Sequence, residues 1–467
     1  MSLWTTWFRC VLQLRGACAR SRSFSWMVVA LAGFCMREDL LGVTSWVRAL
    51  KLRGDVYRRL LHTLHNPGIC VDKLTELWIR LVLKIFQPIT HEGRLVCVAD
   101  GIKVPKEGRK MPAVKKLHQE SGNNSKSPFI MGHSFQALSL LVSAPDGLVA
   151  AVPLASRIHE GVVWSNRDAR TLLDKMAALF LSLVPSLGHP MILVADAFYA
   201  TRKIILPLLR DGHHLVSRVR SNAVAYRPAR KKPGKRGRAK KYGDKVRLKD
   251  LVNRKQGYQT AVSPFGGEAA IRISYLSVDL LWRPVGQLIR FVVVKHPKRG
   301  TIILMSTDTT MDPLKVLLLY GHRFQIELGF RQAIYTLASY QYHLWMKDMH
   351  PIKRNSGNQY MHHRDKEYRR LVKRKLDAYH RYVQLGCVAQ GLLMFLAITH
   401  HRAVWRSCLP WFRTMRVTRA PSELIVRQAL RHHADSFLHD SCPDRNLREI
   451  LKRYRDRRYF RRARASA

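Results

Sequence analysis

The amino-acid sequence predicts an α/β fold in which helices flank a mixed sheet, a β-rich insertion follows the sheet strands, and both ends of the chain are helical. Two observations support this prediction. Between residues 91 and 220, short apolar runs of strand length alternate with helical patterns. Before residue 90, apolar residues recur at the three-and-four spacing of a helix, and residues 378–400 form a long apolar stretch typical of a buried helix.

The composition favours a globular protein that binds nucleic acid. The chain has 467 residues, 47% of them apolar, and its 81 Lys and Arg residues against 32 acids give a net charge of +49. Such an excess attracts a polyanion, and nucleic acid is a better candidate than an anionic membrane or a ribosomal neighbour. The apolar run at residues 27–36 is about half as long as a membrane span requires, so we expect no membrane partner.

The cysteines and histidines predict no structural metal site. The eight cysteines form no Cys-x-x-Cys pair, and no His-Glu-x-x-His motif is present. This usage is typical of reduced thiols, and we expect a cytoplasmic protein.

We expect five regions along the chain. A helical N-terminal region with a possible DNA contact is followed by the first part of the sheet core, a basic loop with a β-rich insertion, a core helix and a basic helical C-terminal region. Their expected bounds are 1–90, 91–220, 221–311, 312–345 and 346–467. For the first region, a helical cap that only covers the core is an equally good interpretation.

Two aspartates follow apolar runs of the predicted core. Residues 95–99 end at Asp100 and residues 191–195 end at Asp196, each in the sequence Val-Ala-Asp. A hairpin at 129–154 and a helix at 165–184 separate these strands, and a helix and a strand follow. This is the order of an RNase H-like core, in which the first and fourth strands are neighbours. A lone Asp at a strand end is usually a turn former, whereas two such residues on neighbouring strands can form a site.

A third acid lies on a predicted helix at residues 320–332. Steps of three and four residues place Tyr320, Arg323, Glu327 and Arg331 on one face of this helix. Apolar residues are expected to seat the helix against the core: Leu317, Leu318, Phe324, Leu328 and Phe330. An Arg–Glu pair on a helix is often only structural, so its meaning depends on the two upstream aspartates.

Basic segments outside the core are expected to contact phosphates without reading sequence. One is the loop at 227–241, which includes Arg230, Lys231, Lys232 and Arg236, and another is the tail at 445–464. Between the loop and the helix, runs at 271–278, 288–295 and 301–306 predict the strands of the β-rich insertion.

In combination, these motifs resemble the DDE transposases of bacterial insertion sequences, in the group marked by a Tyr-x2-Arg-x3-Glu-x6-Lys signature. Tyr320, Arg323 and Glu327 match this spacing, but Ile334 stands where the family has lysine. Arg331 or Lys347 could substitute for that lysine. The first two acids of the family correspond to Asp100 and Asp196, and the resemblance covers about residues 94–340.

The resemblance implies both a metal site and a reaction. Asp100, Asp196 and Glu327 would hold Mg²⁺, for which Mn²⁺ can substitute, because hard cations prefer carboxylate oxygens. Two ions about 3.5–4 Å apart can assist both the attacking and the leaving oxygen of a phosphodiester. The enzyme would cleave element ends and join the 3′ hydroxyl to target DNA. Tyr320 and Arg323 would position a phosphate.

The resemblance also suggests a role for Trp282. An aromatic residue of the insertion would stack on a displaced base near the cleaved end. The alternative interpretation is a hairpin-end residue that packs on its neighbours.

The expected partners are DNA, as terminal inverted repeats and target, and further copies of the chain in a homodimer or larger synaptic complex. The expected location is the bacterial cytoplasm, at the nucleoid. Two other functions remain open. One is a catalytically inactive or domesticated DNA-binding derivative, and the other is an RNase H-like nuclease or resolvase without strand transfer.

Overall fold

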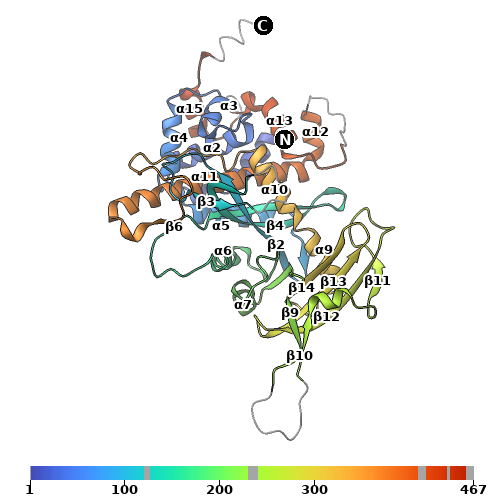
Figure 1. The fold of residues 1–467 in the computed structure, drawn as a ribbon. Coiled ribbons are helices and arrows are strands. Elements are labelled where there is room, and N and C mark those ends of the chain that lie inside the picture. Colours follow the sequence, from blue (N-terminus) through green and yellow to red (C-terminus); the bar gives the residue numbers. More distant parts are fainter. Residues whose placement is uncertain (1, 120–126, 230–239, 409–416, 439–441, 459–467) are drawn as a thin grey trace. The chain divides into compact units, whose positions relative to one another are not determined.

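The computed structural model describes residues 2–119, 127–229, 240–408, 417–438 and 442–458, and Figure 1 shows its ribbon. As predicted, the fold is mixed α/β, with a large mixed sheet and flanking helices. The chain divides into two compact units. Unit 1 contains Met1–Gln87, Gly101–Ala169 and Glu327–Ala467, and unit 2 contains Pro88–Asp100 and Arg170–Ile326.

Helices from both ends of the chain form the larger part of unit 1, in agreement with the helical regions predicted there. The N-terminal helices are α1 (Leu3–Leu12), α2 (Ser21–Met36), α3 (Gly42–Ala49), α4 (Val56–His65) and α5 (Val71–Ile85). The C-terminal ones are α11 (Lys366–Thr399), α12 (His401–Ser407), α13 (Glu423–His432), α14 (Ala434–Ser436) and α15 (Arg445–Tyr454). Their core is rich in fully buried tryptophans, namely Trp4, Trp7, Trp46 and Trp78. The long helix α11 packs against α2, α4, α5 and α13 (Figure 1).

Helix α11 is the core helix of unit 1. Among the described helices it alone has the length and composition to cross a membrane, but 89% of its apolar window is buried inside the protein. Helix α5 approaches it so closely that a Cβ at Gly391 would lie 2.1 Å from the Trp78 ring. A glycine in the middle of α11 is therefore required by packing.

The strands of unit 1 form the predicted antiparallel hairpin. Strands β4 (Phe129–Ser143) and β5 (Val149–Ile158) are joined by a turn in which Asp146 and Gly147 have φ angles of 61° and 68°. Strand β3 (Lys115–His118) pairs with the other edge of β4, and α5 and α11 pack on β5. A separate pair consists of β6 (Val162–Val163) and β15 (Gln359–Tyr360).

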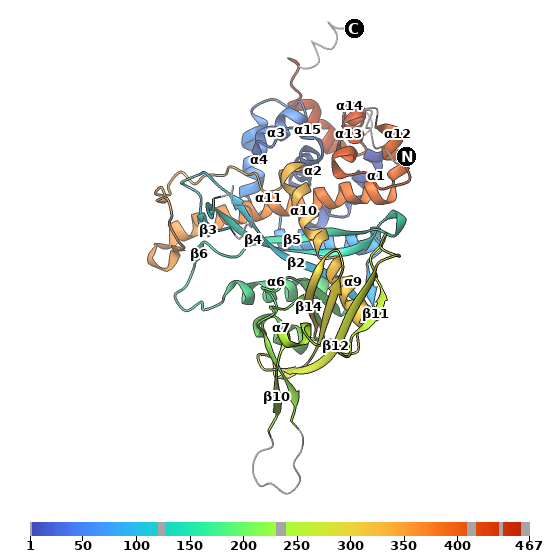
Figure 2. The same cartoon turned by 45° about the vertical axis from the view of Figure 1, so that its right-hand side comes forward.

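Unit 2 is built on a sheet whose order is β10-β9-β12-β13-β14-β8-β7-β2 (Figure 2). Strands β2, β7 and β8 are parallel, and β14 pairs antiparallel with β8. The bounds are β2 (Arg94–Pro105), β7 (Met191–Ala195), β8 (His214–Arg218), β9 (Val224–Pro228), β10 (Tyr242–Arg247), β12 (Arg272–Trp282), β13 (Gln287–His296) and β14 (Gly300–Ser306). The short strands β1 (Thr90–His91) and β11 (Gln259–Val262) pair with β2 and β12.

The β-rich insertion therefore continues the core sheet through β14, whereas its sequence only suggests an interruption. Helices α7 (Arg202–Arg210) and α9 (Pro313–Gly321) pack on the β7–β8 part of this sheet. Helix α6 (Leu172–Leu187) begins at a Thr171–Asp174 capping box and runs past Pro185 to Gly188, whose φ is 69°. The remaining short helix, α8 (Leu248–Val252), follows β10.

Candidate active site

Asp100 lies on β2, and Asp196 directly follows the neighbouring parallel strand β7, as the sequence predicts. All five residues of each apolar run, 95–99 on β2 and 191–195 on β7, are buried. In the strand register Val98 is opposite Val194, so Asp100 and Asp196 are both two residues further on. Neighbouring strands are about 4.8 Å apart, so the backbone positions of the two aspartates lie at the same level of adjacent chain segments. One detail of the prediction is wrong, because β2 does not end at Asp100 but continues to Pro105.

Local hydrogen bonds fix the orientation of Asp196. Its Oδ1 accepts the backbone N–H of Phe198 at 3.0 Å, which closes a turn immediately after β7. Its backbone carbonyl accepts the Ser217 hydroxyl at 2.8 Å and the backbone N–H of Tyr199 at 3.1 Å. Tyr199 is buried, with 3% of its surface exposed, so this turn is anchored to the core.

Arg323 pairs with Asp100. Its guanidinium Nη1 lies 3.2 Å from Asp100 Oδ2, and the two side chains are only 18% and 20% exposed. Tyr320 lies close by, with the Arg323 guanidinium 6.0 Å from the centre of its ring. Burial raises the pKa of Tyr320, while the charges of Arg323 and Arg218 lower it and that of Asp196 raises it. Tyr320 and Arg323 of the predicted signature thus lie beside the aspartates in unit 2.

Arg218 is a further cation at this site, and the sequence analysis missed it. It is the last residue of β8, and the register of β7 with β8 pairs Ala195 with Ser217, so Arg218 is level with Asp196. The sequence could have indicated Arg218, because the end of a third apolar parallel strand lies at the same edge of the sheet.

The predicted helix at 320–332 is interrupted, which corrects the sequence analysis. Helix α9 ends at Gly321 and α10 (Phe324–Tyr335) begins after His322 and Arg323. Hydrogen bonds of the i to i−3 type carry the chain through this turn, with Arg323 N–H donating to the Tyr320 carbonyl at 3.0 Å. A Cβ at Gly321 would lie 2.2 Å from the ring of Phe265, so this contact permits only glycine at the junction.

The burial of α10 also differs from the expectation. Leu317 on α9 is buried, but Phe324 and Leu328 are 53% and 40% exposed and do not seat the helix against the core. The buried residues of this helix are Ile326 and Ala333. The exposed pair is explained by the break before α10, which changes the phase of the helix face.

Glu327 lies in the first turn of α10, one turn after Arg323. The free N–H groups at a helix start favour a negative charge there. Across the described residues, no group of three or more His, Cys, Asp or Glu side chains has the arrangement of a metal site. The convergence of Glu327, which belongs to unit 1, with the two aspartates of unit 2 therefore stays a prediction.

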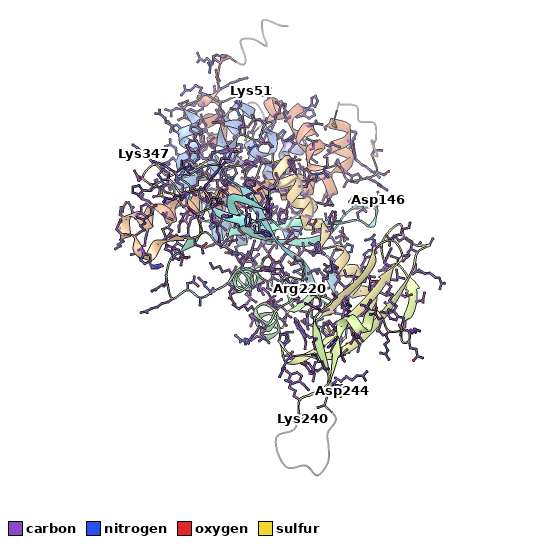
Figure 3. All side chains as sticks on the ribbon, viewed as in Figure 1. Lys51, Asp146, Arg220, Lys240, Asp244 and Lys347 are labelled. Atoms are coloured by element: carbon purple, nitrogen blue, oxygen red, sulfur yellow. The ribbon has the colours of Figure 1, made fainter. Side chains whose placement is uncertain are left out.

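The other predicted basic site residues fall into two groups. Arg331 and Lys347 are exposed, and Ile334, which stands at the lysine position of the signature, is half-buried. Arg230, Lys231, Lys232 and Arg236 lie outside the described residues, although strands β9 and β10, which flank them, form an antiparallel hairpin. Figure 3 labels Lys240 and Asp244, which follow the undescribed residues in the chain.

Trp282 packs in the protein instead of presenting its ring. It ends β12, is 6% exposed, and its carbonyl accepts N–H groups of Val285 and Gly286 at 3.1 and 2.7 Å. This burial favours the packing interpretation, and a DNA contact of Trp282 stays a prediction.

The acids fit a divalent cation by their chemistry. Two adjacent carboxylates offer only oxygen donors, which suits Mg²⁺ or Mn²⁺ and not a thiolate-seeking metal. They repel each other in the absence of a positive charge, and Arg323 is the cation that the structure places on Asp100. The same edge of the sheet carries Arg218 and Tyr320, so an anionic phosphate would meet donors there.

A family model described as DDE superfamily endonuclease matches residues 13–265. The match covers more than half of the chain and includes both aspartates, and the chain therefore belongs to the DDE superfamily endonuclease family. It is a DDE transposase-like protein of nuclease or transposase type whose substrate is DNA, and enzymes of this superfamily generally use divalent metals. The match ends before the segment with Tyr320 and Glu327. No curated protein matches the chain.

Proposed function

We propose that this protein is a transposase that cuts DNA at the ends of an insertion element and joins the freed 3′ hydroxyl to target DNA. The observation that carries the proposal is the parallel register of β2 and β7, which sets Asp100 beside Asp196 with Arg323 on the first acid. The signature spacing that adds Glu327 one turn further supports it.

In this proposal Asp100, Asp196 and Glu327 hold Mg²⁺, and Mn²⁺ can replace it. When bound, the metal neutralises phosphate charge and favours deprotonation of the attacking water or hydroxyl. The side chains of the chain itself then orient the substrate. Arg323 leaves Asp100 to donate to a phosphate oxygen, and Tyr320 donates its phenolic O–H beside it. No serine, cysteine or tyrosine nucleophile is needed, because water and the 3′ hydroxyl attack directly.

The proposal includes the assembly and the location. Cutting two element ends and joining them to one target requires at least two sites, so we propose a homodimer or a larger synaptic complex. The substrates are terminal inverted repeats and target DNA. The site of action is the nucleoid in the bacterial cytoplasm, since the element and its target both lie there.

The experiment is a joining assay with the purified full-length chain, a labelled element end and a target plasmid. Wild type should yield joined product with Mg²⁺ and none with EDTA. Asp100→Asn, Asp196→Asn and Glu327→Gln should each lose on the order of 10³-fold or more in cleavage, while DNA binding persists. Asp211→Asn, an exposed acid after α7, is the matched control and should cleave normally.

Three results would contradict parts of the proposal. Cleavage retained by an Asp100 or Asp196 variant would overturn the assignment of the acids. Nicked DNA without joined product would favour a nuclease or resolvase. Binding without any cleavage would favour an inactive DNA-binding derivative.

A further inference from the structure

A groove of about 870 Å³ lies in unit 1. Its lining includes the segment after β2, the start of β4 and residues 352–355. Backbone hydrogen bonds hold these walls together, from Ile352 N–H to the Arg109 carbonyl at 2.8 Å and from Met346 N–H to the Lys110 carbonyl at 2.9 Å. The Lys110 ammonium adds a bond to the carbonyl of Lys347 at 3.1 Å, and Figure 3 labels Lys347 on this segment. The groove is thus formed before any ligand arrives.

The charged lining of the groove is mostly positive. Arg109, Lys353 and Arg354 are exposed and line it, and Glu107 is the acid that lines it as well. Within the described parts of the chain, none of the three basic side chains forms an ion pair. In that described part, the one hydrogen bond that their charged groups make joins Arg109 Nε to the Ile352 carbonyl at 3.3 Å. Their charges are therefore available to an anionic ligand.

Two exposed aromatic side chains accompany these charges. Phe129 lines the groove and is 44% exposed, and the Lys116 ammonium lies 4.2 Å from the centre of its ring. Trp345 is 63% exposed. Its indole lies against Gly108, a lining residue, because a Cβ there would be 2.8 Å from Trp345 Nε1. Exposing large apolar rings to water is unfavourable, so their place beside free cations calls for a ligand with both charges and flat apolar faces.

Single-stranded DNA has both features. In a duplex the bases are stacked and paired, so protein rings cannot reach their faces without opening the helix. An unpaired strand presents base faces for stacking together with a row of phosphates, and proteins that bind it combine cationic grooves with exposed aromatics. We propose that this groove binds single-stranded DNA, with Phe129 and Trp345 stacking on bases and Arg109, Lys353 and Arg354 contacting phosphates. The proposal depends on the proposed function only for DNA as the ligand.

The test measures binding of a short fluorescent oligothymidylate to the full-length chain in EDTA, so that no cleavage is required. Phe129→Leu and Trp345→Ala should each weaken binding about ten-fold, as expected for the loss of one stacked base. Trp164→Ala, which removes an exposed tryptophan of unit 1 outside the groove, is the matched control and should bind as wild type. The fluorescence of 2-aminopurine in the oligonucleotide should be quenched by wild type and less by the two groove variants.

The charges are tested by salt dependence. Lys353→Ala with Arg354→Ala should lower the slope of log affinity against log salt by about 1.4 for a single strand. Lys366→Ala with Arg369→Ala, two exposed cations on α11, is the control pair and should change it less. Thermal unfolding of every variant establishes that the fold is intact.

Three outcomes would overturn the proposal, and a fourth separates it from the proposed function. Unchanged oligothymidylate affinity and unchanged 2-aminopurine quenching in folded Phe129→Leu and Trp345→Ala proteins would exclude stacking. Equal losses for a duplex of the same length would show a general phosphate contact. Tighter binding of the matching RNA would assign the groove to RNA. If the wild-type protein does not cleave DNA but Phe129→Leu and Trp345→Ala still bind oligothymidylate more weakly than wild type does, the proposed function is contradicted and this inference stands.

Discussion

Arg323 offsets part of the charge repulsion between Asp100 and Asp196. Two carboxylates on neighbouring strands repel each other, and the guanidinium at 3.2 Å from Asp100 offsets part of that repulsion. A divalent cation would offset it further and release the arginine toward a phosphate. We therefore expect the arginine to stabilise the carboxylates when the metal is absent, and the metal to do so when it is bound.

We expect Arg323→Ala to lower the free energy of unfolding by ~1–2 kcal/mol without metal, because it removes a guanidinium that pairs with a largely buried carboxylate. Millimolar Mg²⁺ should raise the melting temperature of this variant more than that of wild type. Arg290→Ala is the matched control, since Arg290 pairs with Asp279 at 2.9 Å in the same unit. Mg²⁺ should not rescue it, and equal rescue of both variants would contradict the metal assignment.

Lys106 is a buried cation in unit 1 that the sequence analysis did not single out. It is 5% exposed, donates to the carbonyls of Tyr340 and Tyr342, and its ammonium lies 4.0 Å from the centre of the Tyr342 ring. Burial lowers the pKa of this amine from 10.5 to about 7. The segment after α10 is thus attached to the unit 1 core by a titratable group.

The sign of its pH effect follows from proton binding. Between about pH 7 and 10.5 the unfolded chain holds a proton that the folded chain lacks, so this residue makes stability rise with pH by at most ~1.4 kcal/mol per unit. Below pH 7 both states are protonated and the effect ends. In urea unfolding, Lys106→Met should lack this rise, whereas Lys115→Met, whose amine pairs with Glu160 at 2.9 Å, should retain it. The same slope in wild type and Lys106→Met would refute the assignment.

The junction between α9 and α10 is the element that places Arg323 beside Asp100. It positions Arg323, and Phe265 from the β-rich insertion packs on Gly321 within it. Gly321→Ala should cost ~1–3 kcal/mol of stability and reduce cleavage, because its Cβ would lie 2.2 Å from the Phe265 ring. Gly266→Ala is the control, since no atom lies within 4 Å of its Cβ.

A double variant separates this contact from a general loss of folding. Phe265→Ala should restore part of the stability and of the cleavage lost by Gly321→Ala, and the coupling energy from urea unfolding measures the contact. If the stability lost by the double variant equals the sum of the losses in the two single variants, Phe265 does not control the junction.

The elements that sequence predicts well are those whose pattern is local. Strands β2 and β7 are predicted because five consecutive apolar residues precede each aspartate, and the β4–β5 turn because its residues suit positive φ angles. The break at His322 and Arg323 is not predicted, because the ring of Phe265, which is distant in sequence, packs there and the helical spacing of apolar residues continues across the break. The burial of Trp282 and the pairing of β14 with β8 are likewise long-range outcomes.

At the scale of the whole molecule, the net charge of +49 should dominate duplex binding. Replacing Arg230, Lys231, Lys232 and Arg236 by alanine should weaken binding to element ends and unrelated duplex alike. The slope of log affinity against log salt should fall by about 3–4 if all four contact phosphates. Arg80→Ala with Arg370→Ala is the control, because glutamates already pair with these arginines at 2.7 and 2.6 Å. A loss confined to the element end would mean that the loop reads bases.

The pairing of Arg323 with Asp100 spans 223 positions of the chain, and this separation matters during synthesis. At ~5–20 residues per second, a ribosome needs roughly 10–45 s after making Asp100 before Arg323 exists. A product that stops after β10 but before Arg323 would keep both aspartates and the β9–β10 hairpin. It would lack Arg323 and Glu327. Such a truncated protein would also lack α11, against which the N-terminal helices of unit 1 pack, so a premature stop in this gene would remove the core of unit 1 together with two of the proposed site residues.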